Sequence, residues 1–221
     1  MHHRFEPELP RRIRIAAPDL TGNEETYLVE ALRSGWVSST GGFLERFERE
    51  FAAACGARHA LACSSGTTAL HLALEALGAR RGDEVIVPAT TFVATANAVR
   101  FCNATPVFVD VDPETWCLDP RGVAAAIGPK TVGIIPVHLL GHPADMDAIN
   151  ALAERHGLWV VEDAAEATFA TYRGRSVGSL ADAAAFSFFG NKIVTSGEGG
   201  AVTFSRDDLG QQMRMLRGHG M

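Results

Sequence analysis

Short apolar runs alternate along this chain with longer segments in which apolar residues recur every three or four positions. The short runs are typical of buried strands in a parallel sheet, and the longer spacing is typical of amphipathic helices. This alternation predicts an α/β fold around a mostly parallel central sheet. The expected parallel strands are His59–Cys63, Glu84–Val87, Val107–Val109, Val132–Val137, Trp159–Val161 and Ala184–Phe188, with helices at Thr67–Leu77, Ala94–Phe101, Arg121–Ile127 and Asp145–Arg155 between them.

Further elements are expected before and after the alternating strands and helices. We expect residues 1–20 to form an N-terminal arm and residues 21–221 to form one domain. Two amphipathic helices, Glu24–Arg33 and Phe43–Ala54, should precede the first strand, each ending near a glycine. A strand at Ala201–Phe204 and a helix at Asp207–Arg217 should close the domain, with Met213 exposed on that helix.

Composition excludes several classes of protein. The 221 residues carry a net charge of −6 and show no dense basic stripe, so nucleic acid is not an expected partner. The most apolar stretch, residues 60–79, is interrupted by polar side chains and is not a membrane span. The cysteines lack metal-ligand spacing, so we expect no metal, reduced thiols and a cytoplasmic location; they are Cys55, Cys63, Cys102 and Cys117.

Lysine is rare in this chain, and one lysine stands in an unusual setting. Of 20 basic residues only Lys130 and Lys192 are lysines, and Lys192 lies in an apolar run rich in glycine. Arginine cannot lose its proton to attack a carbonyl carbon, whereas a desolvated lysine can form a Schiff base. The alternative is a structural ammonium group that pairs with a carboxylate such as Glu198.

Several groups suited to ligand binding follow the predicted strands. Ligands of open α/β sheets bind beyond the carboxyl ends of the strands. Ser64-Ser-Gly-Thr-Thr68 leads into a helix and could cradle a phosphate, although such residues are also common helix caps. Phe92 could offer an aromatic face or belong to the core. His138 could bind a ligand or be a hydrogen-bonded core residue.

Acidic residues follow the strand at Trp159–Val161. Glu162, Asp163 and Glu166 stand at or just after its carboxyl end, where a buried acid needs a partner. We therefore expect one of them to meet a cation. A phosphate cradle, an aromatic face, a buried acid and an isolated lysine are together the four requirements of pyridoxal phosphate.

At these residues the chain resembles the DegT/StrS family of pyridoxal-phosphate enzymes, the sugar aminotransferases of fold type I. The resemblance runs from about Ile15 to Met221. It rests on several separate motifs: Gly35-Trp-Val-Ser-Ser39, Ser64-Ser-Gly-Thr-Thr-Ala-Leu70, Thr91-Phe-Val-Ala-Thr-Ala-Asn97, Pro136-Val-His-Leu139, Gly141-His-Pro143, Glu162-Asp-Ala-Ala165, and Phe186-Ser-Phe188 through Lys192 to Gly197-Glu-Gly-Gly200.

The resemblance implies a three-layer large domain of fold type I and a role for each motif. Lys192 would form the Schiff base with the cofactor, and Asp163 would pair with its ring nitrogen. Phe92 would stack on the ring, and Glu166 stands where relatives often have glutamine or histidine near the ring hydroxyl. The phosphate ligands would be Ser65, Gly66, Thr67 and Ser187; the candidate substrate contacts are Trp36, Ser38 and His138.

Three motifs look most like the perosamine synthase branch of that family. They are Gly35–Ser39, Glu162–Glu166 and Phe188–Lys192. Members of this branch transfer an amino group, usually from L-glutamate, to a nucleotide-linked 4-keto-6-deoxy sugar, and the family resemblance implies a homodimer. One rival is the sugar dehydratase branch, which has histidine in place of the lysine. Another is a non-catalytic cofactor-binding partner.

Relatives continue beyond the motif that stands here at Arg217–Met221. The resemblance therefore implies that the C-terminal small domain is absent from these 221 residues, and we expect the fragment alone to be inactive.

Overall fold

A computed structural model describes residues 16–218 of the chain. The N-terminal arm of residues 1–20 lies mostly outside this range. A seven-stranded sheet of order β1-β9-β8-β5-β4-β2-β3 forms the centre. Its strands are β1 (His59–Cys63), β2 (Glu84–Pro88), β3 (Thr105–Val109), β4 (Thr131–Ile134), β5 (Trp159–Asp163), β8 (Ala183–Ser187) and β9 (Gly200–Phe204).

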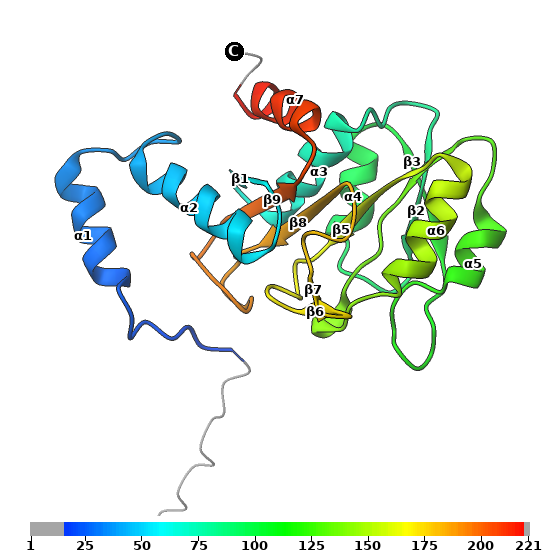
Figure 1. Cartoon of the computed structure of the whole chain (residues 1–221), viewed down its shortest axis with the longest axis horizontal. Coiled ribbons are helices and arrows are strands. Elements are labelled where there is room, and N and C mark those ends of the chain that lie inside the picture. The colour runs from blue at the N-terminus through cyan, green and yellow to red at the C-terminus, as the bar shows by residue number, and fades with distance from the viewer. Residues whose placement is uncertain (1–15, 219–221) are drawn as a thin grey trace, which may run out of the picture.

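Helices cover both faces of this sheet and make the three layers that the family resemblance implies (Figure 1). One face packs on α2 (Gly42–Ala54), α5 (Pro120–Ala126) and α6 (Met146–His156). The other face packs on α3 (Gly66–Ala76), α4 (Ala94–Phe101) and α7 (Asp207–Arg217). Successive strand residues alternate between the two layers.

Strand β8 shows this alternation, because Ala184 and Phe186 enter one core and Ala183 and Ala185 enter the other. Small residues on β8 allow helix α3 to approach the sheet closely. The fold is the mostly parallel α/β architecture expected from the sequence, with β9 antiparallel to both of its neighbours.

Several details differ from the sequence-based expectation, besides shifts of one or two residues at the ends of other elements. Strand β1 was expected among the parallel pairs, but it pairs with the antiparallel β9. Strand β4 ends at Ile134, before Pro136, which has no N–H group to continue the ladder. A small hairpin of β6 (Thr171–Tyr172) and β7 (Arg175–Ser176) was missed because its strands are too short for a periodic pattern. Met213 was expected to be exposed but is fully buried, because α7 packs against α3.

The two ends of the described chain differ in how they pack. Helix α1 (Glu24–Ser34) has no buried residue and projects away from the sheet together with the start of α2 (Figure 1). Helix α7, by contrast, buries Leu209 and Met213. The short 3-10 turn η1 (Leu139–Gly141) follows β4 and leads toward α6.

A long connection joins the adjacent strands β8 and β9 and carries Lys192. Its two ends are held together, since the Phe188 N–H donates to the Gly199 carbonyl at 2.9 Å and the Ser196 N–H donates to the Phe188 carbonyl at 3.0 Å. The connection therefore leaves and re-enters the sheet at one place, at the carboxyl end of β8.

No helix in residues 16–218 is both long enough and apolar enough to cross a membrane. All four cysteines are free thiols.

Candidate active site

A cleft of about 340 Å³ opens at the carboxyl edge of the sheet, where β5 and β8 end and α3 begins. All eight residues that the resemblance assigns to the cofactor line it. They come from five separate segments of the chain, which the fold brings to one place. These eight are Ser65, Gly66, Thr67, Phe92, Asp163, Glu166, Ser187 and Lys192.

The start of α3 is built to bind an anion. Ser65 is the N-cap residue, and its hydroxyl accepts a hydrogen bond from the Thr68 N–H at 3.1 Å. The Thr68 hydroxyl accepts in return from the Ser65 N–H at 3.0 Å, which completes a capping box. The first N–H groups of a helix have no acceptor within the helix and favour a negative group such as phosphate.

Gly66 lets α3 approach the end of β8. A Cβ atom at position 66 would lie 2.8 Å from the Cβ and 3.2 Å from the Cα of Ser187. Any larger residue would therefore push the helix start away from the strand. This contact places the Ser187 hydroxyl beside the helix N-terminus, where both can reach one anion.

We expect Gly66→Ala to weaken phosphate-group binding by about tenfold and to destabilise the domain by about 1–3 kcal/mol, because the added methyl group overpacks this contact. Isothermal titration with pyridoxal phosphate and urea unfolding measure the two effects. Gly128→Ala is the matched control, since a Cβ there meets no atom within 4 Å. Equal behaviour of the two variants would contradict the prediction.

Asp163 ends β5 and presents a buried carboxylate to the cleft. Its side chain accepts hydrogen bonds from the Thr95 hydroxyl at 2.7 Å and from the Ala165 N–H at 3.2 Å. Burial raises the pKa of Asp163, and these two hydrogen bonds oppose that rise. A cation in the cleft would favour the ionised carboxylate, and a protonated pyridine nitrogen is such a cation.

The raised pKa of Asp163 has a consequence for the cofactor-free protein. Between the unfolded pKa, about 3.9, and the higher folded pKa, the native state binds more protons than the unfolded state. The contribution of Asp163 to stability is thus fully present below the unfolded pKa and is lost as the pH rises through the folded pKa. Each unit of pKa difference corresponds to about 1.4 kcal/mol.

The amide of an Asp163→Asn variant would not titrate, so the variant should gain stability relative to the unaltered protein as the pH rises from about 4.5 to about 8. Urea unfolding of the two cofactor-free proteins across this range measures the difference. The change with pH is the relevant quantity, because altered hydrogen bonding adds a constant offset. A difference that does not change with pH would show that burial does not perturb this carboxyl group.

Lys192 reaches the cleft from the connection between β8 and β9. Its side chain is 18% exposed, and its Nζ atom lies 3.4 Å from Oε1 of Glu166. The other carboxylate oxygen of Glu166 accepts from the Leu140 N–H at 2.9 Å. The structural alternative raised from the sequence paired Lys192 with Glu198, whereas the structure pairs it with Glu166; Glu198 also lines the cleft.

Phe92 lies at the cleft, as its interpretation as an aromatic face for a ligand requires. Its side chain is 70% exposed and lines the cleft, so it is not the core residue that was the alternative. An aromatic ring left exposed at a cleft edge can stack on a planar ligand.

The three candidate substrate contacts are not brought into the cleft. Trp36 and Ser38 lie on the exposed loop between α1 and α2, where the Trp36 ring packs near Gly41. His138 is fully buried, and Nε2 of its ring lies 3.0 Å from Glu162. From the sequence, His138 could bind a ligand or be a hydrogen-bonded core residue. The structure shows that it is a hydrogen-bonded core residue.

Two cleft features were not identified from the sequence. Thr95 is fully buried and donates to Asp163, and the hydroxyl of Thr91, four residues earlier, lies 2.9 Å from the Thr95 hydroxyl. The spacing of Thr91 and Thr95 was a signal for this contact, because side chains at positions i and i+4 around a helix start lie on the same side of the helix. Leu140, with φ of 52°, gave no signal, since backbone donors are invisible in a sequence.

One group of potential metal ligands comes together in the described residues. His71, Glu75 and Cys102 bring their ligand atoms within 4.8 Å of one another on α3 and at the end of α4. None of the three lines the cleft at the sheet edge. His71 already pairs with Glu75 at 3.3 Å, and burial raises the pKa of the Cys102 thiol to about 12.

The cleft fits pyridoxal phosphate group by group. The α3 start and Ser187 suit its phosphate, exposed Phe92 suits its ring, Asp163 suits its ring nitrogen and Lys192 suits its aldehyde. Fold and cleft together define a pyridoxal-phosphate-dependent enzyme domain of fold type I. The chain belongs to the DegT/DnrJ/EryC1/StrS aminotransferase family, whose model matches residues 18–221.

Three similar proteins illustrate this relationship. The GDP-perosamine synthase of Caulobacter vibrioides is 57% identical over 214 residues, which cover 97% of this chain and 57% of that protein. The aminotransferase from Psychrobacter cryohalolentis superposes with a TM-score of 0.89 at 44% identity, over 93% of this chain and 53% of that chain. The protein Spr1654 from Streptococcus pneumoniae, solved in its pyridoxal-phosphate form, has a TM-score of 0.88 at 33% identity, over 92% of this chain and 57% of that chain.

The chain thus spans slightly more than half the length of the relatives that it matches. The cofactor of the family is pyridoxal phosphate.

Proposed function

We propose that the full gene product is an aminotransferase that moves the amino group of L-glutamate to a nucleotide-linked 4-keto-6-deoxy sugar, for perosamine-type amino-sugar biosynthesis. The observation that carries this proposal is the meeting of Lys192 and Asp163 in one cleft with the α3 start. Similarity to GDP-perosamine synthase favours a GDP-linked sugar. Residues 21–221 would be the cofactor-binding large domain of this enzyme.

Bound pyridoxal phosphate supplies an electron sink for the bond broken at the substrate carbon. The chain's own residues would do the rest. Asp163 would hold the ring nitrogen protonated, and the α3 start with Ser187 would hold the phosphate. The Lys192 Nζ atom would move the proton at the carbon that bears nitrogen, since it reaches into the same cleft.

Glu166 would assist this proton transfer by holding Lys192. Its carboxylate contacts the Lys192 ammonium group on one side and the Leu140 N–H on the other, so it fixes the lysine relative to the turn after β4. Trp36 and Ser38 remain proposed substrate contacts on the loop after α1, whereas the fully buried His138 is not proposed as one.

Spectroscopy and product analysis test the proposed function. Glutamate alone should convert the bound cofactor to its amino form, and a panel of nucleotide-linked ketosugars should identify the acceptor. A protein that binds the cofactor but is unchanged by glutamate would be the non-catalytic partner. Loss of sugar hydroxyl without amination would instead show the dehydratase.

We further propose a homodimer in the cytoplasm. Phe92 and Phe189, at 49% exposure, are exposed large apolar side chains that line the cleft, and Ile193, next to Lys192 in the sequence, is 64% exposed; such patches mark interaction surfaces. Light scattering on the full gene product should give twice the monomer mass across a concentration series. A fully active monomer would contradict the dimer.

A further inference from the structure

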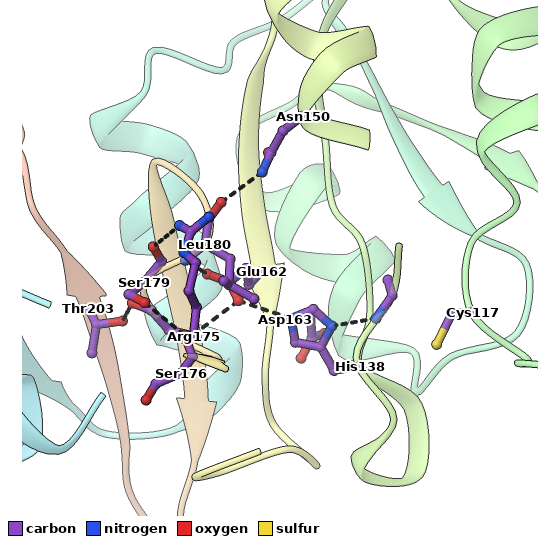
Figure 2. Close-up of polar contacts among 12 residues, drawn as sticks. Cys117, His138, Asn150, Glu162, Asp163, Arg175, Ser176, Ser179, Leu180 and Thr203 are labelled. Carbon is purple, nitrogen blue, oxygen red and sulfur yellow. Dashed lines mark hydrogen bonds and ion pairs between the residues drawn. The ribbon is translucent and has the colours of Figure 1, made fainter. Parts of the chain in front are cut away.

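Glu162 is a fully buried carboxylate directly beside Asp163 in the sequence. Because neighbouring strand residues point to opposite faces, Glu162 turns away from α4 into the layer that holds α6. Figure 2 shows its side chain within a network of polar contacts. The transfer of an amino group does not require a carboxylate at this place, so its role needs an explanation.

Three donors satisfy the Glu162 carboxylate. Oε1 accepts from the Leu180 N–H at 2.9 Å, and Oε2 accepts from the Gly178 N–H at 3.1 Å and lies 3.0 Å from Nε2 of His138. A buried carboxylate is tolerated when its lone pairs are used in this way. The three donors come from two segments that are far from β5 in the sequence.

The proton on the His138 ring can be placed from its partners. The Ala144 N–H lies 3.1 Å from Nδ1, and a backbone N–H can only donate, so Nδ1 is an acceptor. The proton of the neutral ring is therefore on Nε2, which donates to Glu162 (Figure 2). The ring has no free nitrogen left for a ligand.

His138 is also bound to Asp163 through the backbone. The His138 N–H donates to the Asp163 carbonyl at 3.0 Å, and the Asp163 N–H donates to the Pro136 carbonyl at 2.9 Å. The same histidine thus holds both residues at the end of β5, Asp163 by its main chain and Glu162 by its ring. Any shift of His138 moves the backbone from which the Asp163 carboxylate projects.

The outer side of the network is tied to two further elements. The Thr203 hydroxyl on β9 donates to the Gly178 carbonyl at 2.7 Å, and the Asn150 side chain on α6 donates to the Leu180 carbonyl at 2.8 Å (Figure 2). Gly178 has φ of +99°, and a Cβ there would lie 2.7 Å from the Phe186 ring. The turn that binds Glu162 is therefore fixed on both sides.

We propose that the buried Glu162–His138 pair is a positioning pair for Asp163, which fixes the Asp163 carboxylate against the ring nitrogen of the cofactor. This inference rests on the proposed function. A pair that served stability alone could be replaced by apolar residues of similar volume at little cost. A positioning pair cannot, because small displacements at a reacting group have large effects on its interactions.

The test compares two ligands that differ only at the ring nitrogen. Pyridoxal phosphate has this nitrogen, and 1-deazapyridoxal phosphate has carbon in its place. The ratio of their dissociation constants therefore reports the contact between Asp163 and the ring nitrogen, and cancels every other contact. Charge-assisted hydrogen bonds are the strong ones, so the full gene product should prefer pyridoxal phosphate by about tenfold or more.

Glu162→Gln and His138→Leu are the test variants. Glutamine has one acceptor oxygen for three donors, so it leaves at least one buried N–H unpaired. We expect either variant to reduce the ligand ratio by about three- to tenfold, and Glu162→Gln to have little further effect on the ratio in an Asp163→Asn background. His138→Gln, which keeps a donor for Glu162, should restore part of the ratio lost in His138→Leu.

Ile149→Ala is the control for lost stability. Ile149 is fully buried on α6 in the same layer, so its truncation makes a cavity without touching the network. It should lower the urea midpoint and leave the ligand ratio unchanged. Should a test variant fail to fold, His138→Gln and Glu162→Asp provide milder changes for the same measurement.

The outcomes separate this inference from the proposed function. A protein that binds neither ligand refutes the proposed function. If Asp163→Asn lowers the ratio but Glu162→Gln and His138→Leu leave it unchanged, the proposed function stands and the positioning role is refuted. Equal weakening of both ligands by the two variants would likewise show a purely structural pair.

Discussion

Replacing Lys192 with arginine should reduce amination by the full gene product at least about a thousandfold. Arginine keeps a positive charge beside Glu166 but can neither form the imine nor move a proton. General acid–base catalysis alone contributes about 10²–10⁴ in rate, and the loss of the covalent link adds to this. Single-turnover kinetics with glutamate, followed by the cofactor spectrum, measures the effect.

Lys130→Arg is the matched control. Lys130 is exposed just before β4 and does not line the cleft, so its replacement should leave the rate unchanged. Borohydride reduction followed by peptide mapping should place the cofactor on Lys192 in the unaltered protein and in this control. A cofactor trapped on Lys130, or normal turnover in Lys192→Arg, would refute the assignment.

Asp163→Asn should slow the glutamate half-reaction by about 10²–10³-fold while the cofactor still attaches to Lys192. In the proposed function this carboxylate would not make the covalent bond but would stabilise the charge that the bound cofactor takes up. The Thr95 hydroxyl and the Ala165 N–H hold this carboxylate in place.

The attached cofactor and the reaction rate must be measured in the same sample of Asp163→Asn. Asp147→Asn, which alters an exposed carboxylate on α6, controls for the general loss of a charge. A glutamate half-reaction near the normal rate in Asp163→Asn would show that Asp163 is not the partner of the ring nitrogen.

The alternation of short apolar runs and amphipathic segments was sufficient to predict the fold. Strand β1 and helix α4 have the predicted bounds, because their apolar residues end where turn residues begin. The pairing of β1 with antiparallel β9 could not be predicted, since strand direction depends on connections and not on side-chain pattern. The β6–β7 hairpin, whose turn at Arg173-Gly174 has positive φ, was missed for another reason, because two-residue strands show no periodic pattern.

The residues of the site likewise include some that the sequence could predict and some that it could not. Residues at strand ends, such as Asp163 and Lys192, could be placed together because the carboxyl ends of parallel strands share one edge. The roles of Thr95 and Leu140 depend on tertiary hydrogen bonds to Asp163 and Glu166; the spacing of Thr91 and Thr95 was a signal for the first role, and nothing in the sequence signalled the second. His138 also follows a strand, yet it points into the core, which only the three-dimensional structure reveals.

The connection that carries Lys192 begins and ends at one place on the sheet, closed by hydrogen bonds between Phe188, Ser196 and Gly199. Asp163, by contrast, belongs to a strand in the middle of the sheet. The lysine proposed to react thus lies on a connection outside the sheet, whereas the acid proposed to pair with the ring nitrogen lies on a central strand. Substitutions at exposed positions of the connection after Phe188 can therefore change the surroundings of Lys192 without disturbing the core, whereas a substitution on β5 cannot avoid it.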